Sequence, residues 1–350
     1  MSLENHLDNP YSAWMAGVGE DSDVVVSSRV RLARNLEGRP FPQRLEPAAA
    51  EAILMQTEDV IRRWPGDWEF IRLGELSPLE RRVLVEKHLI SPAHAEKPAH
   101  RGLALNADET EAIMVNEEDH LRIQALQSDL DLAGTWDRSV ELDDRLEQDL
   151  DFAFDADLGY LSACPTNLGT GLRASVMMHL PALTFTRRLG PLLGSLAKQG
   201  LAVRGLYGEG TEAAGHLFQI SNQTTLGRTE MEIIQTIHQV ADQVAAEERA
   251  ARQSLLQGGA ERLQDRVGRA WGILLGARIL SGEEAMRLLS DLRLGVEMNL
   301  VDGVSRQTLS ELLVITRPGF LERSAGREMD RLERDIHRAN LVRERLEAGE

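Results

Sequence analysis

The residues best suited to chemistry lie in one short stretch, Asn116-Glu117-Glu118-Asp119-His120-Leu121-Arg122. It brings together three consecutive carboxylates, an imidazole and a guanidinium. Adjacent carboxylates repel one another unless cations face them. The apolar run 111–115 before the stretch is typical of a strand, so we expect these charges at a strand end, beside a core. Further cations that face them must come from elsewhere in the chain.

Arginines are the candidate cations. They stand at predicted strand ends or beside glycine-rich loops, at Arg29, Arg31, Arg122, Arg173 and Arg204. Arg29 and Arg31 alternate along one predicted strand, which places both guanidinium groups on the same side. A converging set would suit a polyanion such as a nucleotide triphosphate, and the chain has no Walker A motif to hold one otherwise. Each arginine taken singly is more often an ordinary surface charge, so the interpretation depends on the set.

The composition indicates the class of protein. The chain has 350 residues, of which 42% are hydrophobic, so it is globular and has room for two domains. A net charge of −17 argues against a nucleic-acid binder and suits basic partners, although an acidic surface also serves solubility alone. The single cysteine, Cys164, excludes a disulfide framework and fits a reducing cytoplasm. We see no signal peptide and no apolar run able to span a membrane, so we expect a cytoplasmic protein.

Hydrophobic periodicity and turn residues predict the elements that position these side chains. The segments expected to be strands are 24–34, 102–106, 111–115, 174–180, 201–204 and 216–221. The segments expected to be helices are 47–64, 77–88, most of 128–151, 181–199 and 229–255. Segments 1–23 and 91–100 are expected to be irregular, and the glycine-rich segment 205–215 is expected to be a mobile loop. Capping boxes begin at Ser77, Thr229 and Ser281.

The character of the chain changes near residue 256. Gly258 and Gly259 form a candidate hinge, and only helical periodicity follows them. We therefore expect two domains, 1–255 and 256–350, the second of them all-α.

Four motifs, taken in their order along the chain, resemble those of a known family. They are Ser27 to Leu36, Asn116 to Arg122, Cys164 to Arg173, and Arg204 to Glu212. Together they resemble the ATP:guanidino phosphotransferases, the phosphagen kinases that include arginine and creatine kinases, over roughly residues 24–250. The resemblance implies an α+β fold in which an antiparallel sheet flanked by helices forms the catalytic domain and an all-α domain follows.

Two departures from the phosphagen kinases resemble the bacterial protein arginine kinases. The free-guanidine kinases carry a small helical domain before the first arginine motif, whereas only residues 1–26 precede it here, and this chain adds a helical region after the kinase-like part. The C-terminal region also contains Arg334-Asp335-Ile336-His337-Arg338-Ala339, which resembles the family's R-D-x-x-R-A site for allosteric phosphoarginine. Arg334 and Arg338 are spaced i, i+4 on one helix face, which would suit a phosphate, although an ordinary charged helix has the same pattern.

The resemblance implies roles for the acidic residues and the cysteine. A guanidinium group, with a pKa above about 12, must be oriented and must lose a proton, and carboxylates suit both tasks. By resemblance, Glu118 is the base, Glu209 is a second orienting carboxylate on the loop, and Cys164 is the reactive cysteine beside the guanidine. A lone cysteine is also often a small apolar filler. Glu117 and Asp119 would shape the field or assist Mg²⁺ through water.

The resemblance also implies a nucleotide site for ATP, with Mg²⁺ between the phosphates and no dedicated metal site in the protein. The residues that match it are Ser27, Ser28, Arg29, Val30, Arg31, His88, Arg122, Arg173, Ala174, Ser175, Val176, Met177, Arg204, Gly205, Leu206, Tyr207, Gly208 and Glu209. Met177 stands where arginine kinases commonly have a histidine, and Gly205-Leu206-Tyr207 departs from their G-T-R. The adenine contacts are therefore expected to differ.

The implied partners are protein substrates with exposed arginines, including a heat-shock repressor, together with a zinc-binding activator protein and a Clp protease that degrades the marked proteins. The chain is expected to form a dimer or larger assembly through its C-terminal domain, and to act in the stress response. Two alternatives stay open. One is a free-guanidine kinase that makes an energy store, and the other is an adaptor that binds phosphoarginine proteins through Arg334 and Arg338.

Overall fold

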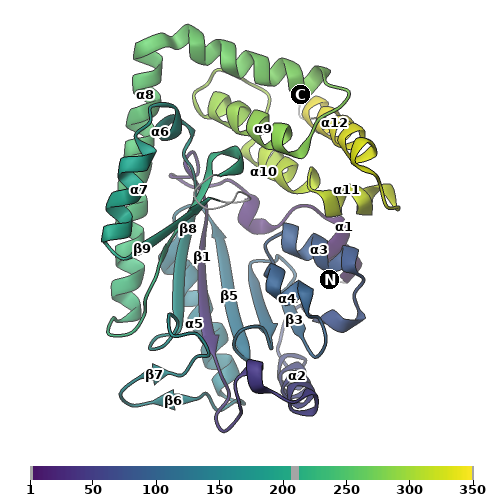
Figure 1. The fold of residues 1–350 in the computed structure, drawn as a ribbon, viewed down its shortest axis with the longest axis vertical. Helices are drawn as coiled ribbons and strands as arrows, with labels where there is room; N and C mark the ends of the chain where they lie inside the picture. The colour runs from purple at the N-terminus through teal and green to yellow at the C-terminus, as the bar shows by residue number, and fades with distance from the viewer. Residues whose placement is uncertain (1–2, 206–212, 349–350) are drawn as a thin grey trace.

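The computed structural model describes residues 3–205 and 213–348 and is built on one large antiparallel sheet (Figure 1). The sheet has eight strands in the order β2-β3-β4-β5-β1-β8-β10-β9. Their bounds are β1 Val25–Arg34, β2 Trp68–Arg72, β3 Gly102–Asn106, β4 Glu111–Val115, β5 Leu121–Ser128, β8 Leu172–His179, β9 Leu201–Gly205 and β10 Leu217–Asn222. A separate two-stranded ribbon consists of β6 Phe154–Asp155 and β7 Gly159–Tyr160. The α+β class expected from the sequence is confirmed.

One face of the sheet is apolar and is covered by helices. Alternate residues of the central strands, such as Val30, Ile123 and Ala174, are fully buried on this face. They form one core with side chains of α2 Pro47–Ile61, α5 Leu132–Glu147, α6 Pro181–Phe185, α7 Leu189–Lys198 and the first part of α8 Glu230–Gly276. Helix α5 crosses behind the central strands, and α8 runs along one edge of the layer (Figure 1).

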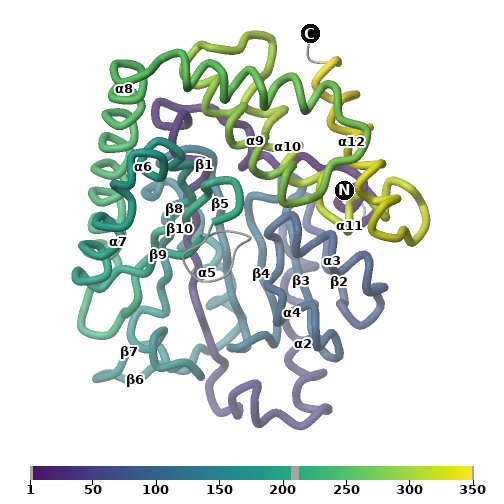
Figure 2. Tube along the Cα trace, turned by 45° about the horizontal axis from the view of Figure 1, so that its top comes forward, coloured from purple at the N-terminus to yellow at the C-terminus, as the bar shows by residue number. Residues whose placement is uncertain are grey.

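A second core joins the other side of the sheet to the C-terminal helices. It contains side chains of α1 Leu3–Asp8, α3 Pro78–Glu86 and strands β2 to β4, near the short α4 Pro92–Glu96. The same core continues into α9 Gly282–Glu297, α10 Arg306–Ile315, α11 Pro318–Ala325 and α12 Arg331–Glu347. Because one core serves both parts, the C-terminal helices are packed directly against the half of the molecule that contains the sheet, and Figure 2 shows α11 beside α3.

Helix α8 connects the two halves and bends at a glycine. It begins with a complete capping box between Thr229 and Glu232, as predicted from the sequence. At Gly259 the backbone has φ 157° and ψ 64°, a conformation that favours glycine, and beyond it α8 turns and runs across the C-terminal helices (Figures 1 and 2). The bend lies close to the expected domain boundary at residue 256, which stays a prediction.

Several local expectations were wrong. The segment 181–199 forms two helices, α6 and α7, because the chain turns at Arg187, whose φ is 58°. The segment 91–100 contains α4, and the lead-in 1–23 contains α1 and the single turn η1 Ala13–Met15. Further single turns are η2 Pro42–Arg44, η3 Leu73–Glu75 and η4 Ala214–His216. Ser281 caps α9 by accepting from the Glu284 N–H, without the full capping box that the sequence predicted.

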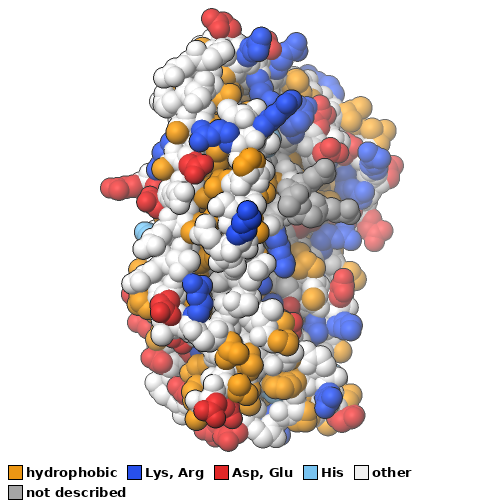
Figure 3. All heavy atoms as spheres, turned by 60° about the vertical axis from the view of Figure 1, so that its left-hand side comes forward, with side chains coloured by type: hydrophobic (Ala, Val, Ile, Leu, Met, Phe, Trp, Pro, Cys, Tyr) orange, Lys and Arg blue, Asp and Glu red, His pale blue; other side chains and the backbone are white. Residues whose placement is uncertain are grey.

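The surface on the α7–α8 side carries charges of both signs. Figure 3 shows basic and acidic side chains scattered over this side, with apolar side chains gathered toward its lower end, where β6 and β7 lie in Figure 1. Phe154 and Leu158, in and beside that ribbon, are among the exposed large apolar residues. Across the described residues, every helix is too short or too polar to cross a membrane.

Candidate active site

The five arginines project from one face of the sheet, opposite the apolar core. Directly opposed residues of antiparallel strands lie on the same face. Arg31 lies opposite Arg173 on β8, and Arg29, two residues earlier on β1, shares its face. Arg122 lies opposite Ala33, which follows the same alternation. The sequence prediction that Arg29 and Arg31 share one side is confirmed, and Arg122 and Arg173 join them.

The register of the neighbouring strands places Arg204 on the same face of the sheet. It lies opposite Gln219 on β10, which lies opposite Met177 on β8, which in turn lies opposite Ser27. Ser175 is on this face as well, because it lies opposite Arg29. Side chains from five strands, β1, β5, β8, β9 and β10, therefore gather on one face of the sheet.

Four of the residues matched to the nucleotide site lie on the opposite, apolar face. Val30, Ala174 and Val176 are fully buried in the core there, and the Ser28 hydroxyl donates to the Asp129 carbonyl at 2.8 Å. Since their side chains point away from the arginines, they could contact a ligand only through backbone groups. Those backbone groups belong to paired strands.

The turn between β4 and β5 presents the carboxylates to this face. Asn116 adopts φ 61°, and its N–H donates to the His120 carbonyl at 2.8 Å, which closes the turn. Asp119 is fully buried and accepts hydrogen bonds from Asn35 at 2.6 Å and from the Ala163 N–H at 2.8 Å. Asp119 therefore anchors the segment that leads to Cys164, rather than facing the cavity.

His120 has a structural role. Its Nδ1 accepts from the Leu36 N–H at 2.9 Å, and its Nε2 lies 2.9 Å from the Pro40 carbonyl oxygen. These contacts tie the carboxylate turn to the segment that follows β1, the strand that carries Arg29 and Arg31.

Glu117 and Glu118 both contact Arg122 but differ in exposure. Arg122 Nη1 lies 2.7 Å from Glu117 Oε2, and Nη2 lies 3.0 Å from Glu118 Oε2. The Glu117 side chain is 6% exposed, whereas that of Glu118 is 40% exposed. Burial would raise the pKa of Glu117, but the charge of Arg122 and hydrogen bonds from Ser91 and the Glu118 N–H lower it below its ordinary value. Glu117 thus fixes Arg122, and Glu118 stays accessible.

A small cavity of about 220 Å³ brings these groups together. It is lined by Arg31, Leu32, Ala33, Glu118, Arg122, Cys164, Thr166, Asn167, Gly171, Arg173 and Arg204. Cys164 Sγ lies 3.1 Å from the Thr166 hydroxyl. We call it the inner cavity; it holds an accessible carboxylate, a thiol and four guanidinium groups.

A second cavity of about 450 Å³ adjoins the inner one, and Arg31 lines both. We call it the outer cavity; its lining is Arg29, Arg31, Val85, Glu86, His88, Ile90, Ser91, Pro92, Met114, Gln124 and Arg317. Withdrawal from water, together with the charges of Arg29 and Arg317, lowers the pKa of His88 to about 3, so its imidazole is neutral near pH 7. The outer cavity combines apolar walls with several hydrogen-bonding groups.

Positive charge exceeds negative charge around both cavities. In the described part of the chain, no carboxylate forms an ion pair with Arg29, Arg31 or Arg173. Withdrawal from water, then the charges of Arg173 and Arg122, lower the pKa of Arg29 to about 10. The same causes, with Arg29 added, lower the pKa of Arg31 well below its ordinary value. Cations that repel one another in this way are matched by a polyanionic ligand.

Gln124 and Arg317 are among the outer-cavity residues that sequence reasoning missed. Gln124 follows Arg122 by two positions on β5, so strand alternation could have found it. Arg317 comes from the C-terminal helices, and no local pattern connects it to the arginine motifs. Leu206, Tyr207, Gly208 and Glu209, which the sequence assigned to the site, lie outside the described residues, while Gly205 ends β9.

The residues matched to an allosteric site lie on α12 and are engaged with the protein itself. Arg338 is 3% exposed and donates to the carbonyls of Thr316 and Leu280, each at 2.8 Å, and to Asp335 at 2.5 Å. Arg334 donates to Glu322 at 2.9 Å, and Ala339 is buried in the second core. A phosphate would have to replace some of these contacts, and the allosteric role stays a prediction.

Comparison with known proteins matches two families along the chain. Residues 53–251 match "ATP:guanido phosphotransferase, C-terminal catalytic domain". Residues 260–350 match "Protein-arginine kinase McsB C-terminal domain". Curated relatives named protein-arginine kinase include one from Symbiobacterium thermophilum, 53% identical over 96% of this chain and 97% of the relative. Another, from Desulforamulus reducens, is 50% identical over 99% of this chain and 98% of the relative.

Solved phosphagen kinase structures share the fold. A lombricine kinase has a TM-score of 0.60 and 26% identity, covering 68% of this chain and 70% of the other. A duplicated taurocyamine kinase from Schistosoma mansoni, solved with bound components of a transition-state analogue, has a TM-score of 0.61 and 26% identity, covering 76% of this chain and 40% of the other.

Proposed function

The chain belongs to the ATP:guanido phosphotransferase family, and we propose that it transfers the γ-phosphoryl group of ATP to arginine side chains of proteins. The observation that carries the proposal is the inner cavity, where the accessible Glu118 carboxylate lies beside Arg31, Arg122, Arg173 and Arg204. Phosphoryl transfer depends mainly on positioning and on stabilising charge, and this cavity supplies groups for both.

The arginines would clamp the triphosphate. Arg31 lines both cavities, so it would hold phosphates between them, while Arg122, Arg173 and Arg204 would surround the phosphoryl group in transfer. Binding of the triphosphate would also relieve the repulsion that lowers the pKa of Arg29 and Arg31. Three members of the clamp, Arg29, Arg31 and Arg173, have no carboxylate partner among the described residues, whereas Arg122 is held in place by Glu117 and Glu118.

Mg²⁺ would enter as part of the ATP substrate. It prefers phosphate oxygens and water, with one or two carboxylates, over an all-protein cage. Among the described residues, no group of three or more His, Cys, Asp or Glu side chains could hold a metal ion. The donor set is compatible with a metal that arrives on its nucleotide.

Glu118 would act as the base toward the substrate guanidinium. A nitrogen of the guanidinium attacks the γ-phosphorus, the bond from that phosphorus to the β-bridging oxygen breaks, and the proton passes from the nitrogen to Glu118 while ADP leaves. The contact of Arg122 with Glu118 at 3.0 Å would hold the carboxylate in place. Glu209 would orient the guanidinium from the loop, and Cys164, in the wall of the inner cavity, would lie beside it.

Three features support a protein rather than a free amino acid as the acceptor. The C-terminal family match and the curated relatives all carry the name protein-arginine kinase. The Glu118 side chain is 40% exposed, so an arginine on the surface of another protein could reach it. The net charge of −17 would attract substrates that present arginine on basic surfaces.

We extend the proposal to partners by resemblance alone. A heat-shock repressor would be among the substrates, a Clp protease would degrade the marked proteins, and a zinc-binding activator would associate with the kinase in the cytoplasm during stress. Dimers would form through the C-terminal helices, and phosphoarginine would bind Arg334 and Arg338 there.

The test is phosphoarginine formation on a basic protein with Mg-ATP, measured by mass spectrometry under non-acidic handling. We expect Glu118→Gln to lose nearly all product while it still binds ATP by calorimetry, since a glutamine cannot accept the proton. Glu37→Gln, the same change at an exposed carboxylate that lines neither cavity, serves as the control. Unchanged product with Glu118→Gln would contradict the mechanism, and rapid phosphorylation of free L-arginine would favour the phosphagen kinase alternative.

A further inference from the structure

The outer cavity has walls from two distant parts of the chain. Arg29, Arg31 and Gln124 come from the sheet, and His88 follows α3. Arg317 comes from the C-terminal helical region, defined here as residues 260–350, where it precedes α11 as its N-cap residue. One arginine of the C-terminal region thus lies in the same cavity as two arginines of the candidate nucleotide site.

A buried carboxylate on α3 fixes the position of Arg317. Glu86 accepts hydrogen bonds from the Gly319 N–H at 2.8 Å and from the Phe320 N–H at 3.1 Å, at the start of α11. These are backbone donors of the first helical turn, which a carboxylate satisfies with help from the helix dipole. A Cβ at Gly319 would lie 2.7 Å from Glu86 Oε2, so the close approach requires glycine. The start of α11 is therefore held against the wall of the outer cavity.

The charge of Arg317 adds to the positive potential of the cavity. His88 experiences the charges of both Arg29 and Arg317, which together with its withdrawal from water keep its imidazole neutral. Among the described residues that line the outer cavity, Glu86 is the only carboxylate, and it already accepts from two N–H groups of α11. The cavity as a whole therefore favours an anionic ligand.

We propose that Arg317 binds the end of ATP that is remote from the γ-phosphate, so that the C-terminal helical region completes the nucleotide site. This assignment depends on the proposed function. The γ-phosphoryl group belongs beside Glu118 in the inner cavity, and Arg31 spans the boundary. The adenosine 5′-phosphate end must then extend outward, and the outer cavity offers it about 450 Å³, with Val85, Ile90 and Met114 as apolar walls.

The assignment links nucleotide binding to the C-terminal region. Because Arg317 is the N-cap residue of α11, a change that shifts α11 against α3 would also change the affinity for ATP, and by reciprocity ATP would stabilise the docked position of α11. A protein without this region would lack one contact to the nucleotide.

The test compares two ligands on the full-length chain. Calorimetry measures the affinity of the wild type and of Arg317→Ala for Mg-ATP and for inorganic triphosphate with Mg²⁺. We expect Arg317→Ala to weaken ATP binding about tenfold, as the loss of one charge-assisted hydrogen bond does. Inorganic triphosphate lacks the adenosine end, so its affinity is expected to change by less than about twofold.

Two variants control for folding. Arg323→Ala removes another arginine of α11, which pairs with Asp8 at 2.8 Å on the surface, and should leave both affinities unchanged. Arg317→Lys keeps the charge and should recover part of the ATP affinity, which a purely structural role would not predict.

Equal ATP affinity of the wild type and Arg317→Ala would overturn the assignment. An equal loss for ATP and for inorganic triphosphate would overturn it too, because Arg317 would then act on the phosphates that the clamp already holds. If the wild type bound no ATP, the proposed function and the assignment of Arg317 would both be overturned. If the wild type bound ATP as tightly as Arg317→Ala does, only the assignment would be overturned.

Discussion

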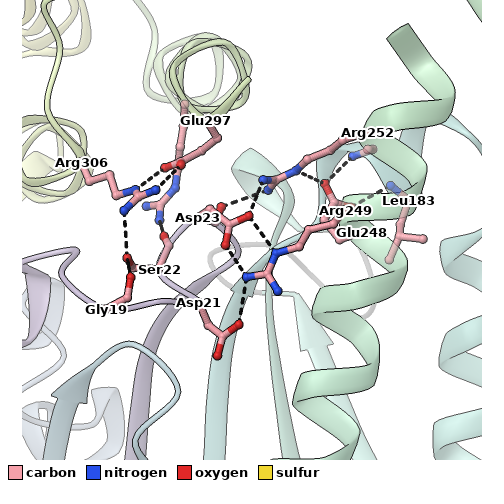
Figure 4. Close-up of polar contacts among 12 residues, drawn as sticks. Gly19, Asp21, Ser22, Asp23, Leu183, Glu248, Arg249, Arg252, Glu297 and Arg306 are labelled. Carbon is pink, nitrogen blue, oxygen red and sulfur yellow. Dashed lines mark hydrogen bonds and ion pairs between the residues drawn. The ribbon is translucent and has the colours of Figure 1, made fainter. Parts of the chain in front are cut away.

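Two arginine clusters in this molecule use the same side chain in opposite ways. In the candidate active site, Arg29, Arg31 and Arg173 face one another without carboxylate partners in the described part of the chain. At the junction of the N-terminal segment, α8 and the C-terminal helices, arginines are paired with carboxylates instead (Figure 4). The first cluster accumulates charge, and the second neutralises it.

The junction cluster is a closed network. Arg249 donates to Asp21 at 2.9 Å and to Asp23 at 2.5 Å, while Arg252 donates to Asp23 at 3.2 Å and to Glu248 at 3.0 Å (Figure 4). The fully buried Glu248 also accepts from the Ala182 and Leu183 N–H groups, at 3.0 and 2.9 Å. Hydrogen bonds to carboxylates raise the pKa of Arg249, the reverse of the change at Arg29.

A similar contact extends the junction to the C-terminal helices. Arg306 donates to both carboxylate oxygens of Glu297, at 2.8 and 2.7 Å, and to the Ser22 hydroxyl at 3.0 Å (Figure 4). At the junction, where carboxylates accompany them, arginines serve structure, whereas Arg29 and Arg31 are available to a ligand. Arg122 combines the two roles, since Glu117 and Glu118 hold it beside the inner cavity.

The largest effect is expected from Arg31→Ala in the candidate active site. Phosphoarginine formation should fall about a thousandfold, as when a charge-stabilising arginine is removed from a phosphoryl-transfer site. The free energy of unfolding should stay unchanged or rise, because the substitution removes a cation that other cations repel. Initial rates and urea denaturation measure the two quantities. A clear loss of stability would place Arg31 with the structural arginines.

At the junction, Arg252→Ala is expected to have the opposite effects: a loss of stability and an unchanged rate. It should lower the free energy of unfolding by about 3 kcal/mol, since the buried Glu248 loses its charged partner. The rate per folded molecule should not change, because Arg252 lines neither cavity. Urea denaturation measures the effect.

Arg249→Ala is the matched control for that variant. Its side chain is 38% exposed, against 5% for Arg252, so solvent screens its ion pairs and the loss should stay below about 1 kcal/mol. Equal losses of unfolding free energy in Arg249→Ala and Arg252→Ala would mean that the burial of an arginine does not determine its contribution to stability at the junction.

Polyanions should stabilise the protein through the unpaired arginines alone. Inorganic triphosphate at a hundred times its dissociation constant should add about 2.7 kcal/mol to the free energy of unfolding. Arg252→Ala should show the same increment as the wild type, and Arg31→Ala a smaller one. Thermal denaturation at constant ionic strength measures the increments. An equal increment in all three proteins would point to binding elsewhere.

The free energy of unfolding should also depend on pH, through two histidines, His179 and His216, that contact Ser290 on α9. Withdrawal from water lowers the pKa of His179 well below 6.5, with Arg293 and Arg252 contributing, and lowers that of His216 to about 4, with Arg266 contributing. Both are neutral in the fold, so only the unfolded chain takes up protons just below pH 6.5. Stability is therefore complete above about pH 6.5 and falls by about 1.4 kcal/mol per pH unit for each histidine, down to about pH 4 for His216.

Urea denaturation between pH 7 and pH 5 measures this slope. His216→Asn should remove one histidine's share of it, because asparagine does not titrate. A slope that is identical in this variant would assign the acid sensitivity to other groups.

The sequence predicted much of the fold because strand and helix patterns are local. Alternation of apolar residues gave most of the strands, and capping boxes located the helix starts at Ser77 and Thr229. It failed where the signal was weak: β5 begins in the charged stretch, and the two-residue strands β6 and β7 are too short to show a period. The turn at Arg187, which divides α6 from α7, lies just before Gly190 and Pro191, a break signal that the prediction of one continuous helix overlooked.

For the candidate site, the match to the family's motifs selected the residues. The alternation of side chains along each strand then decided which of them face the cavities. Arg29 and Arg31 share the polar face, whereas Val30 and Val176 from the same motifs lie in the core. Strand period alone could have separated these two groups, since successive side chains point to opposite faces.

By itself, the sequence determined the family, the α+β class, and the set of carboxylates and arginines that could act on a guanidinium and a triphosphate. Only the tertiary structure decided which arginines are neutralised, because Asp23 and Arg249 are 226 positions apart and meet through packing of α8. Packing also brought Arg317 to the outer cavity. It left the Glu118 side chain exposed to solvent and in contact with Arg122. Charge compensation depends on distance in space, which no local pattern encodes.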